Sequence, residues 1–156
     1  MVDAQSGHEK TITGMLPALA GANVIYGLGM LEMGITFDLA QLVLDNEIAG
    51  MILYSLNGIV VNDETLSVDV IREMGIGKDY LAHASTYKHM KSQSQVQLID
   101  RRMREDWAAA GSTDIYKRAH DSVIEILETY EPAPLPANVL NTIRSIVADT
   151  EKELVR

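Results

Sequence analysis

The stretch Ile48–Val61 constrains the fold more than any other part of the chain, because it is apolar on nearly every side of a helix. A helix of this kind has to be covered by other structure. The stretch is shorter than the roughly 20 residues that cross a bilayer, and Ser55 and Asn57 interrupt it. We therefore expect a buried helix that begins after Thr36 and ends near Val61, and no membrane span.

The chain has little material with which to cover such a helix. Its 156 residues suffice for one domain. With 47% apolar and 22% charged residues, its composition is that of a globular protein rather than a disordered one. Because the chain has too little other structure to bury this helix, we interpret it as a fragment of a longer protein.

Charge and cysteine content exclude several classes of function. The net charge of −9 disfavours a nucleic-acid partner, which needs a basic face. The absence of cysteine excludes disulfide scaffolds, thiolate zinc sites and cysteine nucleophiles. Asp3 and Glu9 stand where a signal peptide would carry basic residues, so we expect a cytoplasmic protein.

Periodicity and turn residues predict mostly helices. A capping box at Ser6–Glu9 predicts a helix that ends near Gly21. Short apolar runs predict strands at Ala22–Gly27 and Tyr80–His83. Helices are expected in four further segments, and Pro132, Pro134 and Pro136 separate the last two: Asp63–Met74, Leu98–Ala110, Asp114–Tyr130 and Ala137–Leu154.

This order of elements is an α/β pattern that does not make a sheet by itself, since two parallel strands leave open edges. It matches the C-terminal part of a TIM (β/α)₈ barrel followed by a helical tail. We expect residues 1–91 to supply the last βα units of an incomplete barrel and residues 92–156 to form a helical extension that packs on it. As an isolated chain it should be predominantly helical.

Several residues are candidates for a binding site. In a barrel the C-terminal end of a strand faces the active-site mouth, so Tyr26, Gly29 and Glu32 would line it, and His83 ends the second strand. The Gly27–Gly29 pair lacks the third glycine of a dinucleotide fingerprint, and a turn that needs backbone freedom at both glycines is the simpler interpretation. The four histidines lack metal-ligand spacing, so no metal site is expected.

The chain resembles the C-terminal part of the trimethylamine methyltransferase family along essentially its whole length. The segments that carry the resemblance, in order, are DAQSGHEK (Asp3–Lys10), LAGANVIYGLGMLEMG (Leu19–Gly34), DNEIAGM (Asp45–Met51), YLAHASTYKHMK (Tyr80–Lys91) and DRRMREDWAAAGSTDIYKRA (Asp100–Ala119).

This resemblance implies a TIM-barrel enzyme that moves a methyl group from trimethylamine, or a related quaternary amine, to the Co(I) of a corrinoid. The corrinoid is carried by a separate cognate protein, so no cofactor is expected to bind this chain directly. Some members use pyrrolysine, encoded by an amber codon a short way before the segment that resembles Asp3–Lys10. Met1 would then be an internal methionine, and the fragment would be inactive alone.

The resemblance assigns no catalytic residue within this chain. A methylammonium group is cationic and apolar, and aromatic faces with a carboxylate suit it best. The family has two histidines where this chain has His83 and Ser85. The substrate-binding candidates are Asp3, Gln5, Tyr26, Gly29, Glu32 and His83.

Two other functions are compatible with the residues. One is a free-standing helical protein that binds partners or oligomerises, and the other is a small α/β enzyme with its own pocket. A standalone protein should carry polar residues on the outer face of Ile48–Val61, where few occur. We also expect homo-oligomers, because a fragment exposes apolar faces that the rest of the barrel would cover.

Overall fold

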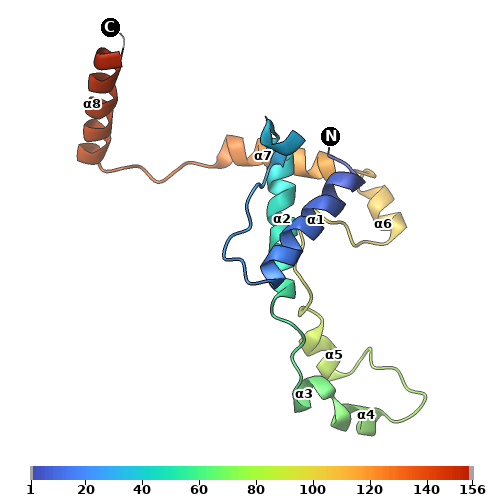
Figure 1. The fold of residues 1–156 in the computed structure, drawn as a ribbon. Helices are drawn as coiled ribbons and strands as arrows, with labels where there is room; N and C mark the ends of the chain where they lie inside the picture. Colours follow the sequence, from blue (N-terminus) through green and yellow to red (C-terminus); the bar gives the residue numbers. More distant parts are fainter. Residues whose placement is uncertain (1, 155–156) are drawn as a thin grey trace. The chain divides into compact units, whose positions relative to one another are not determined.

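The computed structural model describes residues 2–154 (Figure 1). The chain divides into two compact units, Met1–Ile124 and Glu125–Arg156, and each is described by itself. The described residues form helices α1 to α8, a short 3₁₀ turn and two two-residue strands. The expectation of a predominantly helical chain is therefore confirmed.

Helix α1 covers Ala4–Leu19 and begins earlier than predicted. Its N-cap is Asp3, whose Oδ1 accepts the backbone N–H of Ser6 at 3.1 Å, while Ser6 Oγ accepts the N–H of Asp3 at 3.1 Å. The capping box thus starts at Asp3 instead of Ser6, because a carboxylate caps as well as a hydroxyl does. The helix ends just before Gly21, which has a φ of 91°.

The predicted strand at Ala22–Gly27 is wrong for this chain, and so is the one at Tyr80–His83. The strands that form instead are β1 (Met30–Leu31) and β2 (Thr36–Phe37), an antiparallel pair joined by the 3₁₀ turn Glu32–Gly34. A buried parallel strand needs a neighbour on each side. Among residues 2–154, neither predicted segment has a neighbouring strand, and Val24 in the first of them is 73% exposed.

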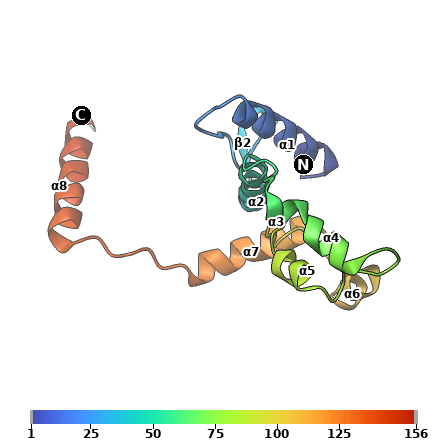
Figure 2. The same cartoon turned by 90° about the horizontal axis from the view of Figure 1, so that it is seen from below.

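Helix α2 (Leu39–Ser55) is the central element of the first unit. It begins at the predicted place, where Asp38 Oδ1 accepts the N–H of Gln41 at 2.7 Å. It ends six residues earlier than expected, and Gly58 follows with a φ of 64°. Helix α1 lies alongside α2 in both views (Figures 1 and 2).

The core of the first unit is small. Ala40 and Leu44 of α2 are buried against Ala119 of α7 (Ile115–Thr129), and Ile52 is buried against α1 near Gly14. The expectation that Ile48–Val61 is wholly buried is wrong, because Leu53 is 57% and Ile59 is 92% exposed. None of the helices among residues 2–154 has the length and apolar character needed to cross a bilayer.

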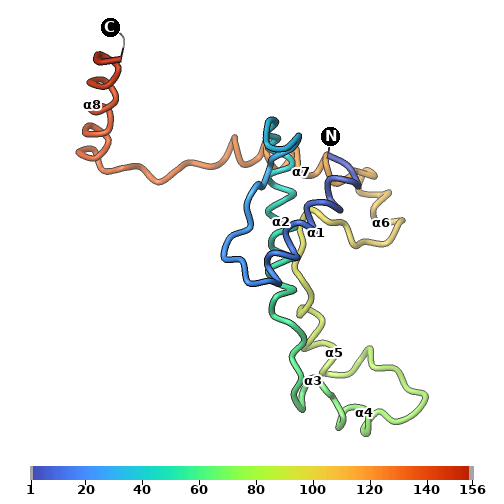
Figure 3. The backbone as a smooth tube through the Cα atoms, in the orientation of Figure 1, coloured from blue at the N-terminus to red at the C-terminus, as the bar shows by residue number. Residues whose placement is uncertain are grey.

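The predicted helix Asp63–Met74 is two helices, α3 (Asp63–Leu66) and α4 (Val68–Met74). The break lies at Ser67, whose φ is 53°. These helices and α5 (Ala84–His89) gather beyond the C-terminal end of α2, as the tube trace also shows (Figure 3).

The predictions for the last helices are mostly confirmed. α7 agrees with the predicted segment to within one residue at each end, and α8 (Ala137–Leu154) agrees at both ends. α6 (Arg104–Ala109) begins six residues later than the predicted Leu98–Ala110. The division into residues 1–91 and 92–156 concerns the whole barrel and stays a prediction.

Candidate functional site

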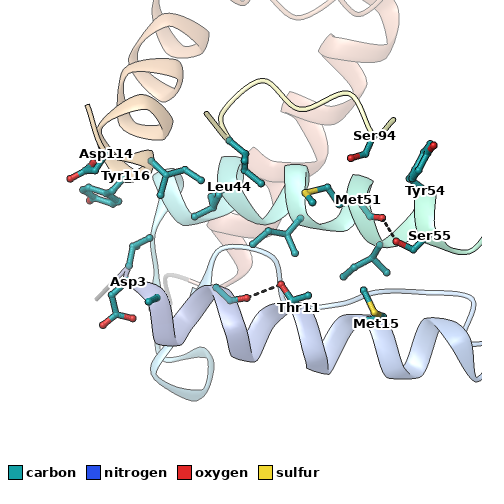
Figure 4. A pocket seen from close by; sticks show the side chains of 17 residues that line it. Asp3, Thr11, Met15, Leu44, Met51, Tyr54, Ser55, Ser94, Asp114 and Tyr116 are labelled. Carbon is teal, nitrogen blue, oxygen red and sulfur yellow. Dashed lines mark hydrogen bonds between the residues drawn. The ribbon is translucent and has the colours of Figure 1, made fainter. Parts of the chain in front are cut away.

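An open groove of about 630 Å³ lies between α1 and α2 in the first unit (Figure 4). Apolar side chains form most of its wall, including Met15, Leu44 and Met51. One end carries the carboxylates of Asp3 and Asp114, together with the ring of Tyr116; Tyr54, Ser55 and Ser94 lie at the other. The groove is thus an apolar trough with negative charge at one end.

The two carboxylates at that end are held by backbone amides. Asp3 Oδ1 accepts the N–H of Ser6, and Asp114 Oδ1 accepts the N–H of Lys117 at 2.7 Å. Among residues 2–154, neither carboxylate forms an ion pair. Their charge therefore remains available to a cation.

The segment 94–99, which contributes Ser94 and Ile99 to one wall of the groove, is bound to α2 through Glu47. Its carboxylate accepts three successive backbone N–H groups, from Gln97 at 2.7 Å, Leu98 at 2.8 Å and Ile99 at 2.7 Å. Arg118 of α7 donates from Nε to the Leu98 carbonyl at 2.8 Å. Bonds to a charged acceptor are stronger than neutral ones, so this segment is firmly placed.

Replacing Glu47 by alanine should release this wall. The amides of residues 97–99 lose their common acceptor, so we expect their hydrogen exchange to accelerate at least about tenfold. Amide exchange measured by mass spectrometry checks this, with Glu47→Gln, which keeps one carbonyl acceptor, giving an intermediate rate. Unchanged exchange in Glu47→Ala would contradict the assigned role.

A buried polar network joins α1, α2 and the segment between them. Asp45 is 4% exposed, and its Oδ2 lies 2.9 Å from Lys10 Nζ and accepts the N–H of Gly29 at 2.8 Å. Gln41 Nε2 donates to Asp45 Oδ1 at 2.5 Å, and Lys10 also donates to the Gly27 carbonyl at 2.8 Å. Lys10 compensates the charge of Asp45, so the network positions the segment and offers no free anion.

One atom of this network has no partner. Gln41 is fully buried, and its Oε1 forms no hydrogen bond with any described residue. An unpaired amide oxygen is less costly than an unpaired donor would be, but it still weakens the network.

Asp100 is paired with Arg102 at the edge of the segment that forms the wall. Arg102 donates from Nε at 3.0 Å, from its terminal nitrogen at 2.6 Å and from its backbone N–H at 2.9 Å. These bonds from Arg102 lower the pKa of Asp100 from 3.8 to about 2.

Because the pKa of Asp100 is lowered, the contribution of its pairing with Arg102 to stability depends on pH. The pairing stabilises the fold fully above the ordinary carboxyl pKa of 3.8 and loses that contribution as the pH falls towards 2. An NMR titration should therefore place the midpoint of Asp100 near 2, and Arg102→Ala should return it towards 3.8. A midpoint that Arg102→Ala leaves in place would show that another group causes the shift.

The structure disperses the residues predicted from sequence. Asp3 lines the groove, Gly29 belongs to the buried network, and Tyr26 lies 84% exposed beside a smaller hollow of about 160 Å³ that Lys10 and Asp45 also line. Gln5 faces outward on α1, where its Nε2 donates to Glu9 Oε1 at 3.0 Å.

The other two predicted residues lie elsewhere. Glu32 sits in the turn between β1 and β2 and accepts a hydrogen bond from the Thr36 hydroxyl at 2.8 Å. His83 caps α5, where its Nδ1 accepts the N–H of Ser85 at 3.1 Å and lies 2.7 Å from the Ser85 hydroxyl. Within residues 2–154, no three metal-ligating side chains come together.

Four residues of these networks were not predicted from the sequence: Lys10, Gln41, Asp45 and Glu47. A signal was present, because Gln41, Asp45 and Glu47 are polar residues on a helix that is mostly apolar. Such residues need partners wherever the helix is covered. Gln41 bonds to Asp45 four residues on, but the partners of Asp45 and Glu47 outside the helix lie 16 to 52 residues away along the chain.

Comparison with known proteins gives a consistent result. The model of the trimethylamine methyltransferase family matches residues 1–155. The trimethylamine methyltransferase MttB of Desulfitobacterium hafniense is 56% identical over 97% of this chain and 30% of its own length. MttB1 of Methanosarcina acetivorans is 48% identical over 96% of this chain and 30% of its own length.

A more distant relative is named for a different substrate. The glycine betaine methyltransferase of Desulfitobacterium hafniense is 29% identical over 98% of this chain and 32% of its own length. The chain thus spans about 30% of the length of the curated relatives that it matches.

Proposed function

The chain belongs to the trimethylamine methyltransferase family, and from this premise we propose that it is part of an enzyme that transfers a methyl group from a methylated amine. The acceptor is the Co(I) of a corrinoid on a separate cognate protein, which enters the reaction as a substrate. The match at 56% identity to a protein named for trimethylamine carries this proposal. The 29% match to a betaine enzyme favours trimethylamine over quaternary amines.

The groove between α1 and α2 supports a methylammonium substrate. Its apolar wall suits methyl groups, and the carboxylates of Asp3 and Asp114 suit the positive charge. Tyr116, at the same end, offers an aromatic face to a cation. Transfer to Co(I) is a displacement at carbon, so the contribution of these residues is to bind and orient the amine.

The complete enzyme is proposed to be a TIM barrel, to which this chain contributes βα units and a helical extension. The exposed apolar residues of the first unit, such as Val24, Leu53 and Ile59, support this because the rest of a barrel would cover them. The isolated chain is then inactive. Pyrrolysine shortly before Asp3 in the longer protein belongs to the same proposal.

The decisive experiment is methyl transfer by the longer protein that contains this sequence. With reduced corrinoid protein, we expect trimethylamine to consume the Co(I) absorbance with a kcat/KM at least about tenfold above that for glycine betaine. The 156-residue chain, assayed alone, should give no transfer. Transfer from neither amine by the longer protein would overturn the proposal and favour a binding protein.

Neutralising Asp3 tests the groove itself. Asp3→Asn keeps the helix cap, because asparagine caps as well as aspartate does. We expect kcat/KM for trimethylamine to fall about tenfold in the longer protein, through loss of charge at the groove. Asp69→Asn, an exposed carboxylate on α4, is the matched control, and an equal effect of both variants would remove Asp3 from the site.

A further inference from the structure

Helix α8 carries an apolar stripe with the spacing of a coiled-coil seam. Its members alternate three and four residues apart: Leu140, Ile143, Val147, Thr150 and Leu154. The Thr150 hydroxyl donates to the Ile146 carbonyl at 2.9 Å, so it is satisfied within the helix and its methyl group completes the stripe. Ile143 is 45%, Val147 51% and Leu154 78% exposed.

Two sets of polar side chains on α8 bear on how it can pair. Those on the outer face bond to one another, since Asp149 lies 3.2 Å from Lys152 and 3.4 Å from Ser145. Arg144 and Glu151 flank the stripe on one side, seven residues apart. Among residues 2–154, neither of them forms an ion pair.

We propose that α8 pairs in antiparallel orientation with α8 of a second copy of this chain. Ile143 then packs against the partner's Leu154, and Val147 packs against the partner's Thr150. Arg144 lies beside the partner's Glu151, and the two-fold symmetry repeats each contact. Leu140, which is only partly exposed, lies N-terminal to the paired stretch.

The two flanking charges select this arrangement. In a parallel pair, the side of the stripe that carries Arg144 and Glu151 faces the other side of the partner's stripe. Arg144 then meets the partner's Val139, and Glu151 meets the partner's Ile146, so neither charge is paired. An antiparallel pair displaced by one heptad brings Arg144 beside the partner's Arg144, and like charges repel. Only the proposed register satisfies both charges and packs the stripe.

The seam spans fewer heptads than the three to four that a free-standing coiled coil needs. The pairing is therefore reversible and concentration-dependent. This inference does not depend on the proposed methyl transfer, and the chain itself is sufficient to test it.

Sedimentation of two charge variants of the full chain is the test. Arg144→Glu places glutamate at both flanking positions, and Glu151→Arg places arginine at both. Each variant alone should dimerise at least about tenfold more weakly than the parent. A one-to-one mixture should dimerise within about threefold of the parent, because each helix then meets the opposite charge. Equal dimerisation of the parent, both variants and the mixture would overturn the proposal.

A cysteine experiment checks the register even where other apolar surfaces also associate, because the chain has no cysteine of its own. Val147→Cys mixed with Thr150→Cys should form a disulfide faster than either variant alone. Ser145→Cys, on the outer face, is the control. Fastest cross-linking of Val147→Cys with itself would indicate a parallel pair and overturn the proposal.

Discussion

Replacing Asp45 by alanine will lower the free energy of unfolding of the first unit by about 3 kcal/mol. The change leaves the Lys10 ammonium, the Gly29 N–H and the Gln41 amide without their shared acceptor. Removing one partner of a buried pair costs about 3–5 kcal/mol, and we expect the lower end because the Lys10 side chain is 24% exposed. Urea unfolding followed by the fluorescence of Trp107, the single tryptophan, measures the loss.

Two controls separate the network from a general effect of losing a carboxylate. Asp69→Ala removes a carboxylate that is 95% exposed and should change the free energy by less than about 0.5 kcal/mol. The double variant Lys10→Met/Asp45→Asn removes both charges and keeps an acceptor for Gly29, so it should cost about 1 kcal/mol. If Asp45→Ala proves as mild as Asp69→Ala, the network does not hold the unit together.

Replacing Gly29 by alanine will have a comparable effect, about 3 kcal/mol. Gly29 has a φ of 77°, and a Cβ there would lie 2.8 Å from Phe37 Cε2 and 3.0 Å from Leu42 Cβ. The left-handed backbone accounts for about 1 kcal/mol and the crowding for about 2 kcal/mol. The same urea titration measures the total loss in free energy of unfolding.

Gly27 provides the matched control for this variant. Its φ of 92° is as unfavourable for alanine, but the nearest atom to an added Cβ is Met30 Sδ at 3.5 Å, an ordinary contact. Gly27→Ala should therefore cost only the backbone contribution, about 1 kcal/mol. Equal losses from the two variants would show that crowding at Gly29 is relieved.

The helices were predictable where local signals decide them. α8 and α7 have amphipathic periodicity over 18 and 15 residues, with prolines between them, and both were predicted to within a residue. Local signals did not decide the strands: β1 and β2 were not predicted, and the two predicted strands do not form. Ala22–Gly27 and Tyr80–His83 have strand-like composition, but a strand forms only where another strand supplies its hydrogen bonds.

The candidate site was predicted only in part for a related reason. The Gly27–Gly29 pair indicated a turn that needs backbone freedom, and both glycines have positive φ. Asp3 was named from the resemblance and lies in the groove. The pairing of Lys10 with Asp45 could not be read from the chain, because 34 intervening residues leave many other partners open.

The amino-acid sequence by itself determined the two amphipathic helices α7 and α8, the glycines at the turn, and a resemblance to the family to which the chain belongs. These depend on local conformational preference and on the order of residues. Tertiary structure alone decided which polar residues of α2 are buried and paired, and where the groove lies. Burial and ion pairing depend on segments distant in the sequence, since an apolar helix specifies that it must be covered but not by what.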